Sequence, residues 1–241
     1  MSTPVILSPH PDDAVLSLWH VLAAPEPVRV LNVFGGSPDG HRGDPWWDRV
    51  TGAEDSVIRV RERHAEDCAA LAMAAREPEN LGFLDGQYRD AEPALEPIVE
   101  AIASAAPADA PLLAAAGLDG HRDHRLVRAA ALALHAAGRA VVLYADVPHA
   151  TRFGWPTWVT GDPADPHLDP EAFWSQHLRD TGVDLAALSP DVRELDPSEF
   201  ERKRAAVREY RTQVPALEWE FGMLSRPEVL RYEVVWPLPA A

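Results

Sequence analysis

Two short segments of the sequence concentrate imidazole and carboxylate side chains. The first, residues 8–13, contains His10, Asp12 and Asp13 and follows an apolar run that predicts a strand. The second, residues 117–124, contains His121, Asp123 and His124 and also stands between a strand-like run and a helical pattern. Imidazole and carboxylate groups are typical ligands of catalytic zinc, which keeps one position open for water. The two segments indicate metal-dependent hydrolysis if the fold brings them together.

The elements that would position these segments alternate between strand and helix. Strands are predicted at residues 5–8, 28–34, 81–84, 112–116 and 141–147, and helices at 14–24, 56–75, 93–106 and 126–137. Such alternation predicts a mostly parallel sheet between helices, that is, a Rossmann-like three-layer α/β/α sandwich. Ligands of this architecture bind beyond the carboxyl ends of the strands, where both polar segments are expected.

The length of 241 residues suits one domain. Residues 1–147 form the expected α/β core. The pattern of residues 148–241 is looser, with a helix predicted at 198–214 and a strand at 231–236. We expect this C-terminal extension to wrap the sheet and to build part of a substrate pocket.

Composition excludes several classes of function. The formal net charge of −16 opposes binding to nucleic acid. No apolar run approaches the roughly 20 residues of a membrane span, so we expect a cytoplasmic protein without a membrane partner. The single cysteine, Cys68, excludes an internal disulfide and is expected to fill the core. The single lysine, Lys203, lies in a charged run that predicts a solvated helix face.

The spacing within the first segment suggests how a metal site could form. His10 and Asp13 are three residues apart, so a helix that begins near Asp12 would let them converge while Asp12 points elsewhere. If the first and fourth strands are neighbours, His124 completes a triad with an open position. Asp12, Asp13 or Asp123 alone could equally be a helix cap.

The two motifs resemble those of the PIG-L/LmbE family of metal-dependent N-deacetylases. The family's His-Pro-Asp-Asp-Glu appears as residues 10–14 with Ala14 in the last position, and its His-x-Asp-His appears as residues 121–124. Arg59 with Glu62, and Asp85 before a glycine, also resemble family features near the substrate. The resemblance extends to about residue 150. Ala14 puts the substrate in doubt more than the reaction.

The resemblance implies a metal site of His10, Asp13 and His124. Zn²⁺ is the expected ion, with Fe²⁺ or another divalent metal as alternatives. Asp12 would be the general base for the metal-activated water.

The resemblance also implies roles for the remaining motif residues. His121 would stabilise the oxyanion or protonate the leaving amine. Asp123 would hold the His121 ring in its productive tautomer.

The expected reaction is removal of an N-acetyl or other N-acyl group from a small-molecule amino sugar or sugar conjugate. One alternative is a metal-dependent amidase that acts on a larger thiol-sugar or natural-product amide. Another is a non-catalytic small-molecule-binding protein of the same fold. The sequence leaves open whether the chain forms a homo-oligomer.

A further set of residues is predicted to contact the substrate, although each also has an ordinary structural explanation. Paired indoles in a long loop can stack on a sugar or pack the loop down, and charged pairs are common on helix surfaces. The residues of this set are Arg59, Asp85, Trp46, Trp47 and His41.

Overall fold

Over the residues that it describes, the computed structural model has one sheet of seven strands in the order β3-β2-β1-β4-β5-β7-β6. The structure describes residues 2–163 and 165–240. The strands are β1 (Val5–Ser8), β2 (Arg29–Asn32), β3 (Pro78–Asn80), β4 (Leu112–Ala115), β5 (Val141–Tyr144), β6 (Asp191–Glu194) and β7 (Tyr232–Pro237). The pairs among β1 to β5 are parallel, whereas β7 pairs antiparallel with both β5 and β6. The predicted mostly parallel sheet is confirmed.

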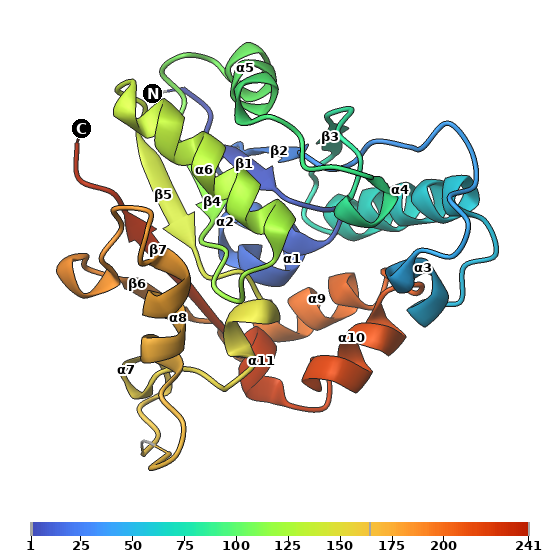
Figure 1. Cartoon of the computed structure of the whole chain (residues 1–241). Coiled ribbons are helices and arrows are strands. Elements are labelled where there is room, and N and C mark those ends of the chain that lie inside the picture. Colours follow the sequence, from blue (N-terminus) through green and yellow to red (C-terminus); the bar gives the residue numbers. More distant parts are fainter. Residues whose placement is uncertain (1, 164, 241) are drawn as a thin grey trace.

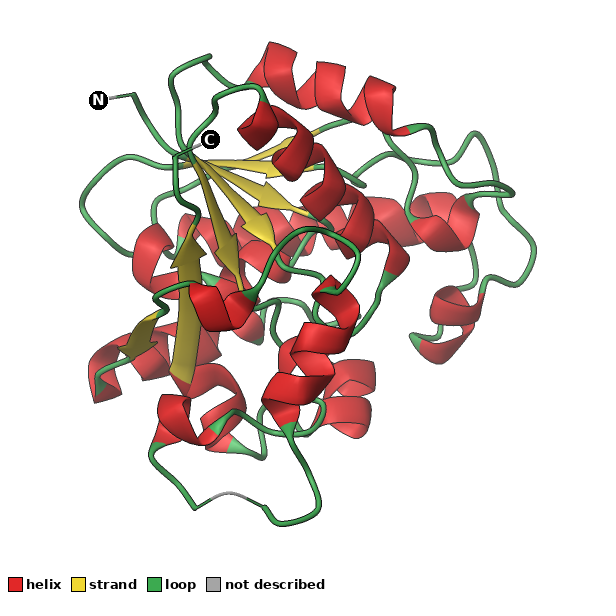
Figure 2. Ribbon diagram, turned by 60° about the vertical axis from the view of Figure 1, so that its left-hand side comes forward, coloured by secondary structure: helices red, strands yellow, loops and turns green. Residues whose placement is uncertain are grey.

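Helices cover both faces of this sheet (Figures 1 and 2). On one side α5 packs on α6, which contacts β4 and β5. Another group of helices is centred on α9, which contacts α1, α2, α4 and α11. The α-helices are α1 (Asp13–Ser17), α2 (Trp19–Leu22), α3 (Trp46–Val50), α4 (Ser56–Ala72), α5 (Leu95–Ala105), α6 (Arg122–Ala136), α7 (Thr157–Thr160), α8 (Pro170–Leu178), α9 (Pro197–Val207), α10 (Val214–Phe221) and α11 (Pro227–Arg231). Short 3₁₀ turns occupy Gly86–Tyr88, His149–Thr151 and Leu185–Ala187. None of the helices within the described residues is both long and apolar enough to span a bilayer.

Strand β1 lies at the switch point of the sheet. It pairs with β2 on one side and with β4 on the other, and Val5 is in register with both Arg29 and Leu112. Every residue of β1 and β4 is buried, as expected for strands covered on both faces. The first and fourth strands are therefore neighbours, which is the condition for the proposed triad, and the loops that follow them open at the same edge.

The expected helix over residues 14–24 is two helices with a break at Leu18. The carboxylate of Glu233 causes this break because it accepts hydrogen bonds from the backbone N–H groups of Trp19 and His20, at 2.7 and 2.9 Å. Glu233 also accepts a 2.6 Å hydrogen bond from Nζ of Lys203, whose side chain is fully buried. The expectation of a solvated Lys203 is therefore wrong, because its charge pairs with Glu233 inside the core.

Other differences lie in the connections. The third strand covers Pro78–Asn80 rather than residues 81–84, and the loop at 37–52 contains α3. The C-terminal part does more than wrap the sheet, because β6 and β7 extend it. Cys68 is exposed rather than part of the core, since Asp67 and Leu71 lie on the buried side of α4.

Candidate active site

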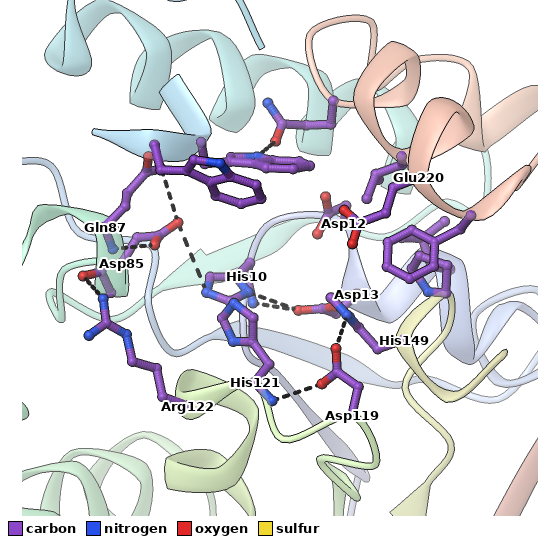
Figure 3. Close-up of a pocket in the computed structure, with 18 of the residues that line it drawn as sticks. His10, Asp12, Asp13, Asp85, Gln87, Asp119, His121, Arg122, His149 and Glu220 are labelled. Carbon is purple, nitrogen blue, oxygen red and sulfur yellow. Dashed lines mark hydrogen bonds and ion pairs between the residues drawn. The ribbon is translucent and has the colours of Figure 1, made fainter. Parts of the chain in front are cut away.

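Three predicted ligands meet where the loops after β1 and β4 come together. His10 lies in the first loop, Asp13 begins α1, and His124 lies in the first turn of α6. Nδ1 of His10 and Nε2 of His124 each lie 3.4 Å from Oδ2 of Asp13. All three side chains are buried, and their ligand atoms lie within 4.8 Å of one another. Figure 3 shows His10 and Asp13 pointing toward one another in the pocket.

The outer nitrogens of both imidazoles contact buried carboxylates. Nδ1 of His124 lies 2.9 Å from Oδ2 of Asp146, and Nε2 of His10 lies 3.0 Å from Oδ2 of Asp123. Nε2 of His124 is buried and has no hydrogen-bond partner among the described residues. Carboxylates placed in this way fix the tautomer and orientation of metal-binding histidines. The donor set therefore fits a divalent cation held by His10, Asp13 and His124.

The electrostatics of the triad also favour a cation. Burial alone would lower the pKa of His10, but the carboxylates of Asp85, Asp123 and Asp13 outweigh it and raise this pKa to about 9. Burial likewise opposes the charge of His124, yet Asp13 and Asp146 raise its pKa well above the usual value. The negative potential that stabilises a proton on these rings would also stabilise a bound metal ion.

A second group, formed by His10, His121 and Asp123, also brings its ligand atoms within 4.8 Å. The Asp123 carboxylate is already engaged, since it accepts a 2.5 Å hydrogen bond from Nη2 of Arg89 and a 2.8 Å bond from the backbone N–H of Gly86. A cation at this position would lie beside the Arg89 guanidinium. The triad that contains Asp13 and His124 is therefore the better metal site.

Asp12 has a strained backbone and a perturbed carboxyl group. Its φ of 134° is rare for a residue with a side chain. Burial and the nearby Asp13 carboxylate raise the pKa of Asp12 to about 7, although Arg63 and His10 oppose this rise. Asp12 lines the pocket, where a carboxyl group that titrates near neutrality can accept and return a proton.

His121 is the N-cap of α6. Its Nδ1 accepts a 3.3 Å hydrogen bond from the backbone N–H of Asp123, so the ring proton is assigned to Nε2. Burial and the neighbouring imidazole of His124 lower the pKa of His121 to about 3, which keeps this ring neutral. The expectation that the Asp123 carboxylate holds His121 is wrong, because that carboxylate points to His10, Arg89 and the Gly86 backbone instead.

Asp85 lines the pocket and pairs with an arginine of α4 that the sequence analysis did not single out. Oδ2 of Asp85 lies 2.9 Å from Nη1 of Arg63 and 4.0 Å from Nε2 of His10. Arg59 is not among the pocket-lining residues because its guanidinium donates to the carbonyl of Thr51 and to Glu62. The Arg-x-x-Glu spacing recurs one helical turn later, at Arg63, and this repeat is the signal that sequence reasoning missed.

His149 and Asp119 form a pair on the pocket wall that the sequence interpretation also missed. Nδ1 of His149 forms an ion pair with Oδ2 of Asp119. The His149 ring packs edge-on against Phe221, with centroids 5.4 Å apart, and against His124 at 5.0 Å. Burial opposes the charge of Asp119, but His149 and His124 lower the pKa of this carboxyl group. His149 follows β5 at the same edge of the sheet, which the rule of strand ends could have indicated.

One pocket of about 550 Å³ adjoins the triad, although His124, Asp123 and Asp146 are not among its lining residues. The residues described above that line it are His10, Asp12, Asp13, Arg63, Asp85, Asp119, His121, His149 and Phe221. Trp46 and Trp47 lie in its lining, where a substrate could reach them, whereas His41 is exposed in the preceding loop and is not part of the lining. The other lining residues are Leu16, Gly86, Gln87, Arg122, Pro148, Arg152, Gln213, Leu217 and Glu220. Figure 3 shows Asp85 and Gln87 on one side and Glu220 and Asp12 on the other.

Comparisons with known proteins identify the family of the chain and proteins of similar fold. The family model described as PIG-L, GlcNAc-PI de-N-acetylase, matches residues 5–135. The 2′-N-acetylparomamine deacetylase of Streptomyces fradiae is 33% identical over 165 residues, which cover 61% of this chain and 57% of that protein. The match thus spans little more than half of that relative.

Two similar solved structures extend the likeness to the C-terminal part. A triple mutant of a deacetylase of the teicoplanin biosynthetic pathway has a TM-score of 0.73 and 25% identity, covering 100% of this chain and 99% of that one. The A40926 pseudoaglycone deacetylase has a TM-score of 0.69 and 26% identity, covering 99% and 98%.

Proposed function

Because this chain belongs to the PIG-L family of de-N-acetylases, we propose that it hydrolyses the N-acetyl or another N-acyl group of an amino sugar or sugar conjugate. Similar proteins described as deacetylases of 2′-N-acetylparomamine and of the A40926 pseudoaglycone support this substrate class. The observation that carries the proposal is the placement of His10 and His124. One nitrogen of each ring lies 3.4 Å from Asp13, and the other contacts a buried carboxylate.

His10, Asp13 and His124 would hold a divalent cation, with Zn²⁺ as the first choice and Fe²⁺ as the alternative. When bound, such an ion supplies Lewis-acid chemistry, which polarises an acyl carbonyl and lowers the pKa of water to about 7. Asp146 and Asp123 keep the two rings in the tautomers that leave their inner nitrogens free.

Asp12 accepts and returns the proton of the hydrolysis. As the water oxygen attacks the acyl carbon, the Asp12 carboxylate takes one water proton. The tetrahedral intermediate then breaks its C–N bond, and Asp12 returns that proton to the leaving nitrogen. The products are a free amine and a carboxylic acid. A pKa of about 7 for Asp12 suits both directions of this transfer.

His121 donates a hydrogen bond to the developing oxyanion. The helix cap fixes its proton on Nε2, the nitrogen that does not contact the backbone. A neutral ring with a fixed N–H group is a donor that needs no reorganisation during the reaction. Of the two roles considered for His121, this geometry favours oxyanion stabilisation over protonation of the amine.

The reaction is tested by loading purified protein with Zn²⁺ or Fe²⁺ and measuring amine release from N-acylated sugars. Acetate release from N-acetylglucosamine derivatives is the expected result. Release of longer acids only would favour the amidase alternative. Bound metal without hydrolysis of any N-acyl amine would overturn the proposal and favour a non-catalytic binding protein.

A further inference from the structure

An exposed indole lies at the aromatic side of the pocket. Trp46, the first residue of α3, is 58% exposed and packs against Trp47 with ring centroids 5.4 Å apart and an angle of 39° between the planes. Nε1 of Trp47 donates a 2.6 Å hydrogen bond to Oε1 of Gln213, the residue before α10. Trp46 therefore lies on a second, anchored aromatic ring.

Further hydrogen bonds at Asp48, the residue after Trp47, hold helix α3 in place. The backbone N–H of Asp48 donates to Oε1 of Gln87 at 3.0 Å, and the hydroxyl of Tyr88 donates to Oδ1 of Asp48 at 2.7 Å. The helix that carries Trp46 and the Trp47 ring against which it packs are thus both held by hydrogen bonds before any ligand binds. A fixed apolar surface at a pocket is suited to stacking with a ring, because little entropy is lost when the complex forms.

Trp46 and Trp219 are both exposed, but only Trp46 lines the pocket. Trp219 is 85% exposed on α10 and is not among the pocket-lining residues. Trp46 lines the same pocket as His10 and Asp12, so one ligand can contact the catalytic groups and the indole together. The volume of about 550 Å³ lies within the range of roughly 300–1,000 Å³ that encloses drug-sized ligands.

The pocket lining formed by α10 and Arg152 includes one ion pair. Nη2 of Arg152 lies 2.8 Å from Oε1 of Glu220, and its guanidinium carbon lies 5.0 Å from the centroid of Phe221. Leu217 and Phe221 add apolar surface to this part of the lining. A neutral ring that contacts Trp46 and this part of the lining meets apolar groups and a compensated ion pair, and needs no charge of its own.

We propose that the substrate is an N-acylated sugar that carries a second, neutral ring, and that this ring stacks on Trp46. The inference rests on the proposed N-deacylation, since it places the acyl group at Asp12 and the second ring at the indole. Trp46 then determines specificity by favouring glycosides over free monosaccharides.

The test measures binding separately from turnover. Zinc-loaded Asp12→Asn protein is titrated calorimetrically with N-acetylglucosamine and with its 4-methylumbelliferyl β-glycoside, and amine release by the wild type is measured with both compounds. The glycoside is expected to bind at least about tenfold more tightly. Adding Trp46→Ala should remove this preference, whereas adding Trp219→Ala, a matched indole deletion outside the pocket, should retain it.

The outcomes separate this inference from the proposed reaction. Equal affinity for the two compounds, undetectable binding, or a preference that survives Trp46→Ala would overturn the inference even if the wild type releases amine. A Trp46-dependent preference without amine release would support the inference and contradict the proposed hydrolysis.

Discussion

His124 and Asp146 form a fully buried pair in which Nδ1 of the imidazole lies 2.9 Å from Oδ2 of the carboxylate. Oδ1 of Asp146 accepts from the backbone N–H of Leu118 at 3.1 Å, which fixes the carboxylate plane. In Asp146→Asn, the amide oxygen would keep the Leu118 bond and the amide nitrogen would face Nδ1. The ring would then place its proton on Nε2, the nitrogen that faces Asp13.

We therefore expect Asp146→Asn to weaken metal binding by about 10- to 100-fold. Zinc affinity is measured by competition with a chromogenic chelator, and excess zinc should restore much of the turnover. Asp191→Asn, an exposed change in β6, is the control. Unchanged zinc affinity in Asp146→Asn would show that this carboxylate does not set the His124 tautomer.

Loss of the base and loss of a ligand should give different phenotypes. Asp12→Asn is expected to keep bound zinc while kcat falls by about 10²–10⁴-fold, because only the proton acceptor is removed. His124→Ala is expected to lose zinc and turnover together. Metal content and amine release are measured on the same preparations. Near-normal turnover of Asp12→Asn would rule out Asp12 as the base.

The parts of the site that could be predicted from sequence are those carried by short motifs at strand ends. His10 and Asp13 are three residues apart, and His124 could be placed near them only on the condition that the first and fourth strands are neighbours, which the strand order of the structure meets. Asp146 and His149 follow the last parallel strand at the same edge, but no motif marks them. Their roles depend on side-chain contacts across the fold.

Contacts between residues that are distant in the sequence also explain why the surroundings of Lys203 and Asp123 were predicted wrongly. Lys203 is 30 residues from Glu233, and nothing in its charged run predicts an ion pair inside the core. The orientation of the Asp123 carboxylate likewise depends on Arg89, 34 residues away. Periodicity predicted a helix at Lys203, and the structure confirms it with an end at Val207 instead of residue 214. Periodicity could not reveal the acid on β7 that faces this lysine.

The Lys203–Glu233 pair allows a test of stability. Lys203→Met leaves the buried Glu233 carboxylate with only the His20 side chain and backbone N–H groups as partners, so we expect the free energy of unfolding to fall by about 3–5 kcal/mol. Adding Glu233→Gln removes the buried charge and should recover part of this loss. Urea denaturation measures both variants, with Arg204→Met on the same helix as the control. Equal stability of Lys203→Met and the wild type would show that the pair contributes no net stability.

Asp67 makes stability depend on pH. Burial raises its pKa from 3.8 to about 6, although hydrogen bonds from Asn32 and Tyr210 oppose the shift. Because the pKa of Asp67 is higher in the folded protein than in the unfolded chain, the protonated carboxyl group favours folding. That stabilisation is complete below pH 3.8 and is lost as pH rises through about 6. The shift corresponds to about 3 kcal/mol.

Asp67→Asn removes this titration. Its stability relative to the wild type should therefore rise between pH 4 and pH 7, by up to about 3 kcal/mol. Urea unfolding at a series of pH values measures the difference, with Asp39→Asn as an exposed control. A constant difference across this range would contradict the raised pKa.

Arg63 and Arg59 are one helical turn apart on α4 but differ in their partners. Arg63 reaches Asp85 in the pocket, whereas Arg59 bonds Thr51 and Glu62 outside it. Arg63→Gln removes a buried charged hydrogen bond beside Asp12, so kcat/KM should fall by about 10- to 100-fold. Arg59→Gln should leave kcat/KM within about threefold of wild type and lower the free energy of unfolding by about 1–3 kcal/mol. Steady-state kinetics and urea denaturation of both variants check this contrast. A catalytic loss in Arg59→Gln without one in Arg63→Gln would instead favour the arginine indicated by the sequence resemblance.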